Sequence, residues 1–253
     1  MMPGRIAQTL YKYAPLVILA VAWEAAVRAG LVSPTMLPPL SDVFKSLVRL
    51  FSHGAIFGHA WSSLVRLVAG LSAAIVVGVL VGLLMGTWRA AHLIFQPFLN
   101  LLYPMPKSAL IPLMMILFGL GDTSKILLVF LGCLLPLVVN AYNGARGVDT
   151  KLIWSARNLG AGNLRVLTSI RMRAALPDIM NGIRTALAFS FVILVNAELI
   201  FGQDGLGYLV GSFGSLGEYS SMFATIIIIV AAGFACDRLF QRFSDHLLRW
   251  RAV

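Results

Sequence analysis

Few side chains in this 253-residue chain could do chemistry, and the most distinctive are ionisable groups set in apolar sequence. Lys107 follows a proline-rich stretch, and Glu198 lies two residues after Asn196. A charge within a membrane-spanning helix costs about 2.5–3.5 kcal/mol on insertion scales, so such a residue is a candidate for a solute pathway. The candidates for lining a pathway are Tyr103, Pro104, Pro106, Lys107, Asn196 and Glu198.

Structural roles for the same residues stay open. Lys107 could form an ion pair or donate to carbonyls freed by the neighbouring prolines, or it could lie outside a misplaced span. Glu198 would be structural if a cation such as Lys107 neutralised it. Glu24 precedes Arg28 by four residues, which favours an ion pair on one helix face.

The signatures of soluble enzyme chemistry are missing from the sequence. The segment 119–125 resembles a phosphate-binding loop but lacks the glycine directly before its lysine, and no HExxH or GxSxG motif occurs. The four histidines are scattered, and Cys133 and Cys236 lie in apolar runs where free, buried thiols are expected. We therefore expect no catalytic, metal-binding or cofactor-binding residue, and any energy for transport must come from another chain.

The composition indicates which elements position these residues. The chain is 59% hydrophobic and 12% charged, with mean hydropathy +0.87, which predicts an all-α polytopic membrane protein and excludes a large catalytic domain outside the membrane. A net charge of +10 could suggest a nucleic-acid partner, but the basic residues do not gather on one soluble face. Six spans are predicted, at 13–30, 62–87, 95–118, 124–143, 178–201 and 220–241, the first of them uncleaved.

The distribution of the 20 lysines and arginines predicts the orientation of these spans. Five of them (Arg28, Lys45, Arg49, Arg66 and Lys125) fall on one side, Lys107 falls within a span, and the other 14 lie on the opposite side. Positive residues near span ends favour the cytoplasm. Both termini and the connection between spans 4 and 5 are therefore predicted to be cytoplasmic.

Three segments have informative patterns. Residues 43–51, which follow a turn at 37–42, predict an amphipathic helix along the outer membrane interface, with a solvated connector as the alternative. Small residues at every fourth position of span 2 predict close packing against another helix, in the same subunit or in a second one. They are Gly70, Ala74, Gly78, Gly82 and Gly86. Four prolines between 97 and 112 predict that span 3 is bent or broken.

The connection between spans 4 and 5 predicts a docking platform for another protein. Apolar residues recur at helical spacing before and after Gly160-Ala161-Gly162, which predicts two short surface helices that are joined by a glycine hinge and stop at Pro177. The alternative is a basic amphipathic pair that rests on anionic lipid.

The same connection resembles the EAA loop of permease subunits of bacterial ABC importers, E-A-A-x3-G-x9-I-x-L-P. When Gly160 is aligned with the motif glycine, Trp154-Ser155-Ala156 takes the place of E-A-A and Ile170-Arg171-Met172-Arg173 that of I-x-L-P. Seven segments in register resemble the nitrate/sulfonate/taurine branch over nearly the whole chain. They are 37–43, 63–70, 103–107, 118–125, 144–149, 174–177 and 205–209.

This resemblance implies a MetI-like fold: residues 1–60 would form an extra transmembrane helix and an external interfacial helix, and 61–253 the transmembrane core, with a coupling loop at about 144–177. It implies a second permease copy or paralogue, two cytoplasmic ATPases that carry ATP and Mg, and an external solute-binding protein received by the turns 119–125 and 202–219. The chain would lie in the bacterial inner membrane and pass a small anionic solute. The ATPase-coupling residues would be Trp154, Ser155, Ala156, Arg157, Leu159, Gly160 and Ala161.

The sequence departs from the motif at its first position, where Trp154 replaces glutamate. Our hypothesis is that docking persists with altered chemistry, because tryptophan can fill an apolar groove at an interface; a partner permease with the fuller motif is an alternative. Two other classes of protein compete with the permease. A stand-alone carrier or channel would be expected to have coupling-ion carboxylates or a repeated half, and a membrane enzyme would need catalytic residues.

Overall fold

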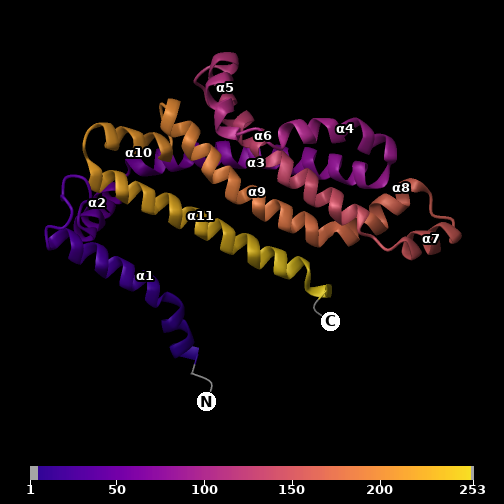
Figure 1. Cartoon of the computed structure of the whole chain (residues 1–253), viewed down its shortest axis with the longest axis horizontal. Helices are drawn as coiled ribbons and strands as arrows, with labels where there is room; N and C mark the ends of the chain where they lie inside the picture. The colour runs from indigo at the N-terminus through magenta and orange to yellow at the C-terminus, as the bar shows by residue number, and fades with distance from the viewer. Residues whose placement is uncertain (1–4, 252–253) are drawn as a thin grey trace.

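A computed structural model describes the backbone of residues 5–251 and the side chains of 14–54 and 56–250, and every regular element in these residues is a helix. The long helices and their neighbours are shown in Figure 1. They are α1 (Arg5–Arg28), α2 (Leu40–Ser52), α3 (Ala55–Thr87), α4 (Arg89–Leu102), α5 (Leu110–Phe118), α6 (Asp122–Arg146), α7 (Thr150–Asn158), α8 (Asn163–Val166), α9 (Met172–Phe201), α10 (Leu206–Ser215) and α11 (Tyr219–Leu247).

The core of the molecule is formed by α3, α6 and α9. Small residues let α3 approach α6 closely: a Cβ added at Gly82 would lie 2.5 Å from the Val138 carbonyl oxygen, and one at Gly86 would lie 2.6 Å from Ala145 Cβ. The predicted close packing of span 2 is therefore confirmed, and its partner is α6 of the same chain. Buried side chains of all three helices, among them Ala74, Leu137 and Leu194, form the main apolar cluster.

The predicted spans correspond to helices of this bundle. Four helical segments are long and apolar enough to cross a membrane: 56–87, Asp122–Arg146, Asn163–Phe201 and Tyr219–Leu247. Predicted span 3 is the pair α4 and α5, which meet at 81° around a break at residues 103–106, so the expected break is confirmed. The first predicted span falls on α1.

Helices α1 and α2 lie beside the core. The ion pair expected on α1 is present, with Arg28 Nε donating to Glu24 Oε1 over 2.7 Å. The other Glu24 oxygen accepts from the amide of Ser41 at 3.2 Å and so caps the first turn of α2. Figure 1 shows the rest of α1 leading away from the bundle. Helix α2 packs Val43 and Ser46 inward and leaves Phe44 exposed.

The prediction that the helix after the glycine hinge stops at Pro177 is wrong. One helical segment runs from Asn163 to Phe201, through a π-helical turn at Leu167–Arg171 and through Pro177. Proline removes one backbone donor and favours a kink. Packing outweighs this cost, because Ala175 and Ile179 are buried against α6 residues on either side of the proline. The segment after the glycine hinge is therefore continuous with predicted span 5 and forms its N-terminal extension.

Candidate functional sites at the two ends of α9

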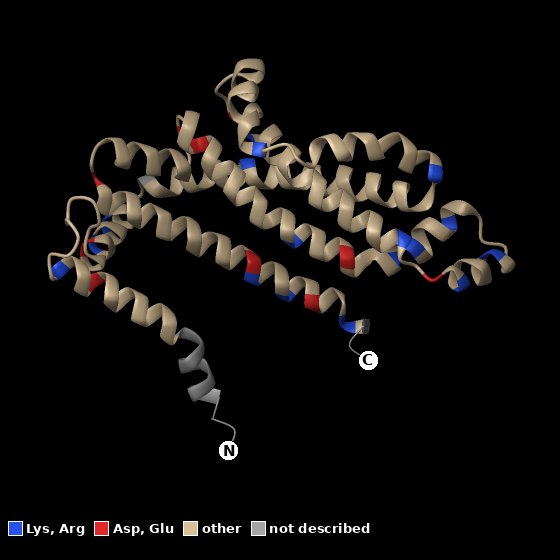
Figure 2. Ribbon diagram, in the orientation of Figure 1, with Lys and Arg blue, Asp and Glu red and all other residues tan. Residues whose placement is uncertain are grey.

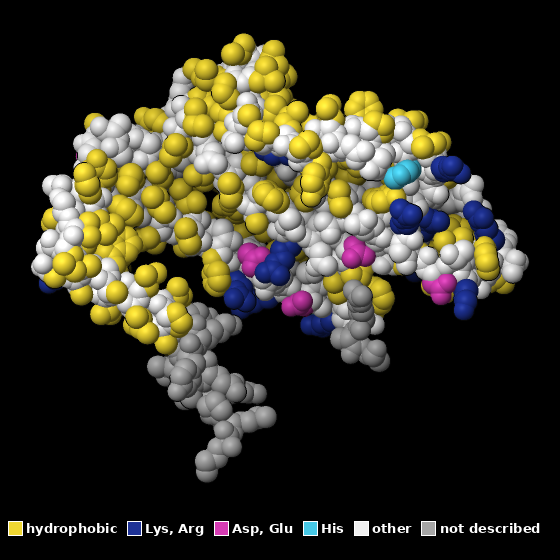
Figure 3. All heavy atoms as spheres, in the orientation of Figure 1, with side chains coloured by type: hydrophobic (Ala, Val, Ile, Leu, Met, Phe, Trp, Pro, Cys, Tyr) yellow, Lys and Arg dark blue, Asp and Glu magenta, His cyan; other side chains and the backbone are white. Residues whose placement is uncertain are grey.

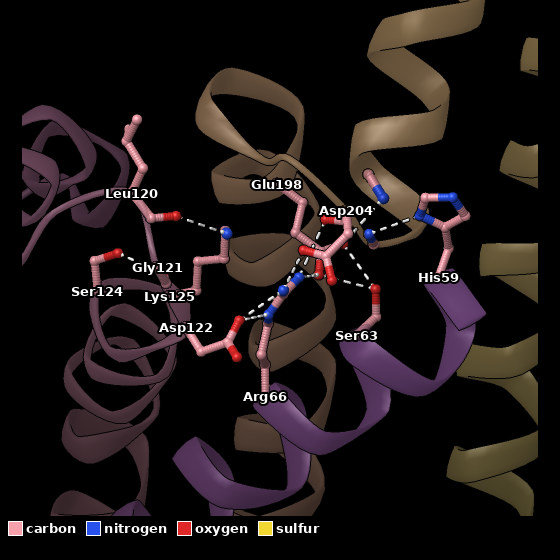
Figure 4. A network of polar contacts seen from close by, with 12 residues as sticks. His59, Ser63, Arg66, Leu120, Gly121, Asp122, Ser124, Lys125, Glu198 and Asp204 are labelled. Carbon is pink, nitrogen blue, oxygen red and sulfur yellow. Dashed lines mark hydrogen bonds and ion pairs between the residues drawn. The ribbon is translucent and has the colours of Figure 1, made fainter. Parts of the chain in front are cut away.

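The end of α9 that carries Glu198 holds a buried polar cluster around Arg66 of α3 (Figure 4). Arg66 Nη1 donates to Glu198 Oε1 over 2.9 Å, and the two side chains are 3% and 0% exposed. Arg66 Nε donates to Asp122 Oδ1 over 2.6 Å, and Nη2 forms an ion pair with Asp204. We call Arg66, Glu198, Asp122 and Asp204 the Arg66 network. It joins α3, the start of α6, the end of α9 and the loop after α9.

The Ser63 side chain and the backbone at Gly205 and Gly207 also lie close to the Glu198 carboxylate. Ser63 Oγ lies 2.9 and 2.8 Å from its two carboxylate oxygens, and the amide of Gly207 donates to Oε2 at 3.0 Å. Gly205 has φ +107°, and a Cβ there would lie 2.3 Å from the Glu198 carboxyl carbon. The glycine is therefore needed both for the left-handed backbone and for the space that Glu198 occupies.

The network reaches the surface through its two aspartates. Asp122 is 66% exposed and Asp204 is 42% exposed. Burial opposes ionisation of Asp204, but hydrogen bonds from Arg66 and Ser62 and the charge of Arg66 outweigh it, so the pKa of Asp204 lies below its ordinary value. Asp204 is therefore an anionic partner of Arg66 near neutral pH.

Lys125 is a second buried cation close to this network. It is 1% exposed, its Nζ donates to the Leu120 carbonyl over 3.1 Å and lies 5.5 Å from the centre of the Phe201 ring. From the sequence, Arg66 and Lys125 are predicted only as charges that orient the spans, and their burial is not predicted. The available signal was the position of Arg66, which is the only charge in the apolar run from 60 to 87.

The pathway candidates do not form one site. Asn196 is exposed and lines a groove of about 590 Å³ between α9 and α11 with apolar residues such as Phe191 and Phe234, whereas Glu198 faces the Arg66 network. At the break between α4 and α5, Lys107 donates to the carbonyls of Leu102 and Met105, the latter at 2.9 Å. Tyr103, Pro104 and Pro106 form that break. Glu198 therefore pairs with Arg66 and not with Lys107, the cation considered from the sequence.

The opposite end of α9 leads into the platform formed by α7 and α8. Asp149 caps α7 by accepting from the Lys151 amide at 2.9 Å, and Gly160 ends the segment with φ +83°. Only Ile153 of α7 is buried, against Val148 and Val166. Helix α7 is thus fixed along one face and free along the other.

The free face of α7 carries the residues aligned with the EAA motif. Trp154 is 61% and Leu159 87% exposed, Ser155, Arg157 and Gly160 are exposed, and Ala156 and Ala161 are half-buried. Lysines and arginines gather at this end of the molecule, whereas acidic residues are sparse there (Figures 2 and 3). An exposed apolar surface with a basic surround is typical of a protein-docking site.

The fold and these two sites define a polytopic helical membrane protein of the permease class. The family of inner membrane components of binding-protein-dependent transport systems matches residues 74–249, and the chain belongs to this family. It is a multi-pass membrane protein and the permease subunit of an ABC importer, as the sequence predicted.

Two curated relatives match nearly the whole chain. A putative aliphatic sulfonates transport permease protein, SsuC of Bacillus subtilis, is 34% identical over 94% of this chain and 86% of its own length. The taurine transport system permease protein TauC of Escherichia coli is 33% identical over 93% of this chain and 87% of its own. These relatives confirm the branch that the sequence resembles.

Among solved structures, an inward-facing conformation of the MetNI methionine ABC transporter matches with TM-score 0.64 and 19% identity. The match covers 77% of this chain and 95% of that one. This likeness supports the MetI-like helical fold.

Proposed function

We propose that this permease imports a small organic anion of the sulfonate class. The support is the similarity over nearly the full chain to permeases named for aliphatic sulfonates and taurine. An external solute-binding protein would deliver the anion to the turns 119–125 and 202–219. Two copies of the chain, or one copy and a paralogue, would enclose the pathway in the bacterial inner membrane.

Helix α7 would dock on a cytoplasmic ATPase, one for each permease subunit, and ATP and Mg would be bound there and not by this chain. The observation that carries this assignment is the shape of the platform: Ile153 fixes α7 from behind while Trp154 and Leu159 stay exposed. The excess of basic residues at this end supports a cytoplasmic location for it and for both termini.

Uptake and co-purification test the proposed function. The complex should contain an ATPase, and proteoliposomes supplied with ATP and the binding protein should accumulate labelled taurine or an alkanesulfonate in a vanadate-sensitive manner. Uptake driven by an ion gradient without ATP would instead indicate a stand-alone carrier. Retention of neither compound by the binding protein would contradict the sulfonate assignment.

Trp154→Ala tests the docking surface. Loss of one large apolar anchor at an interface typically costs 2 kcal/mol or more, so we expect about 30-fold weaker ATPase binding. Trp61→Ala is the matched control, because Trp61 is 67% exposed and lies on α3 near the opposite end of the bundle. Unchanged ATPase co-purification and transport in Trp154→Ala would rule out this role.

Lys107→Met tests the pathway role of Lys107. We propose that Lys107 lies beside the route of the anion, next to the break in span 3. Lower uptake by an intact complex would support this role, whereas loss of assembly would indicate that capping the Leu102 and Met105 carbonyls is its purpose.

A further inference from the structure

We propose that Arg66 is a positioning residue that holds two segments together and passes contact at either of them to α9. The segments are 119–125, which includes the first turn of α6, and 202–206, and we call them the loops. The two loops are far apart in the sequence, one at the start of α6 and the other after α9. The effect on transport rests on the proposed function, in which the external binding protein contacts these loops. The effect on loop spacing does not.

The geometry of the guanidinium supports this role. Its Nε contacts Asp122 of the first loop at 2.6 Å, while Nη1 contacts the Asp204 carbonyl of the second loop at 3.1 Å and Nη2 its carboxylate. Nη1 also donates to Glu198. Arg66 is the only cation that forms ion pairs with these three carboxylates among the side chains that the structure describes. The guanidinium spreads its five donors in a rigid planar fork, which suits contact with three segments at once, whereas an ammonium group has three donors on a single nitrogen.

Burial divides the network into a fixed part and an adjustable part. Arg66 and Glu198 are inaccessible to solvent, so breaking their pair would leave an uncompensated buried charge. Asp122 is exposed and Asp204 is partly exposed, and contacts of solvent-exposed carboxylates are weak and readily exchanged. A protein that touches either loop can therefore shift an aspartate without breaking the buried pair.

Helix continuity gives the network a route to the platform. Glu198 lies near one end of the helical segment Asn163–Phe201, and the other end leads to α7 through the hinge at Gly160-Ala161-Gly162. Movement of the loops relative to Arg66 thus acts on the same segment that positions the platform. The Arg66 network would therefore link contact of another protein with the loops mechanically to α7, the helix that docks on the ATPase.

The first experiment measures loop spacing in the purified permease in nanodiscs. Spin labels at Leu120 and Gln203, both exposed, report the distance between the loops after Cys133 and Cys236 are replaced by alanine. Arg66→Lys keeps the charge beside Glu198 but removes the guanidinium fork that reaches both aspartates, so the distance distribution should broaden about twofold. Arg49→Lys, at an exposed position of α2, is the matched control. An unchanged distribution in Arg66→Lys would overturn the proposal.

The second experiment uses the assembled complex with its ATPase and its binding protein, with taurine as the probe. In Arg66→Lys, maximal stimulation of ATP hydrolysis by the binding protein should fall about fivefold or more, with basal hydrolysis retained. A higher half-saturating concentration with the same maximum would indicate a docking defect only and overturn the link.

A second variant keeps the test decisive if Arg66→Lys does not assemble. Asp122→Asn with Asp204→Asn leaves the buried pair intact and should lower the same maximum. Full stimulation in this double variant would overturn the link. A native complex that the binding protein does not stimulate would contradict the proposed function instead, and the spin-label distances would still decide whether Arg66 holds the loops.

Discussion

At the scale of single residues, the Arg66–Glu198 pair stabilises the fold only as a complete unit. Taking two charges out of water is unfavourable, and this pair compensates with an ion pair, the Ser63 hydroxyl and the amide of Gly207. Every Glu198 oxygen therefore has a donor. A change of one partner while the others remain should therefore lower the free energy of unfolding strongly.

Glu198→Gln is expected to lower the free energy of unfolding by about 3 kcal/mol, the lower end of the range for breaking a buried pair. The lower end applies because Asp122 and Asp204 still face Arg66. Denaturant unfolding of the purified permease in detergent measures the change. Glu218→Gln is the control, since Glu218 is exposed and outside the network, and it should change stability by less than about 0.5 kcal/mol. Equal stability of the two variants would contradict the assigned pairing.

Sequence reasoning found Glu198 but not its partner. An isolated carboxylate in an apolar run is visible from residue types alone, so Glu198 was predicted as a site residue. Its partner lies 132 residues away on α3, and only the packing of α3 beside α9 brings them together. Lys107, the partner considered from sequence, instead caps carbonyls within its own broken segment because those acceptors are local.

At the scale of elements, the contact between α3 and α6 depends on the absence of side chains along one face of α3. A Cβ at Gly82 would meet backbone atoms of α6, which cannot move aside as a flexible side chain could. The helices would have to separate or shift along their whole contact. Small residues permit this kind of close packing in membranes, where apolar burial alone gives little attraction between helices.

Gly82→Ala should therefore destabilise the permease by about 1–3 kcal/mol, the usual cost of overpacking. Gly58→Ala is the matched control, because no atom lies within 4 Å of a Cβ there, and it should be neutral or stabilising by up to about 1 kcal/mol. Thermal unfolding in the same detergent compares the two. A stable Gly82→Ala protein would mean that the two helices separate more easily than their packing implies.

The elements were predicted better than their ends. Hydropathy located the spans because about 20 apolar residues are needed to cross a membrane, and the four prolines located the break in span 3. The predicted helix end at Pro177 was wrong because the local effect of proline is outweighed by burial of this helix against α6. The Asp149 cap and the exposed Trp154 follow from local sequence and were within reach of prediction.

At the scale of the whole molecule, Arg171 connects the platform with the helix core. It is the last residue of the π-helical turn, and Nη1 donates to the carbonyl of Gly86 in α3 and, at 3.3 Å, to that of Ala145 in α6. These carbonyls belong to the final turns of both helices, which lack partners within the helix. The Arg171 side chain thus connects the N-terminal end of α9 to the C-terminal ends of α3 and α6.

Arg171→Gln should uncouple hydrolysis from transport. Without these hydrogen bonds, movement of α7 would bend the π-helical turn and would not be transmitted to α3 and α6. We expect the ratio of solute taken up to ATP hydrolysed to fall about fivefold, with ATPase binding retained because the exposed face of α7 is unchanged. Measurement of uptake and phosphate release in the same proteoliposomes gives this ratio.

The control for this prediction is Arg173→Gln, an exposed arginine two residues further along the chain. It removes the same charge from the same region but no hydrogen bond to α3 or α6, so the ratio should stay at the native value. Uptake and hydrolysis that fall in proportion in Arg171→Gln would show that Arg171 supports only folding or docking. A lowered ratio in Arg171→Gln alone would mean that the connection to α3 and α6 carries the motion, since charge and location are matched in the two variants.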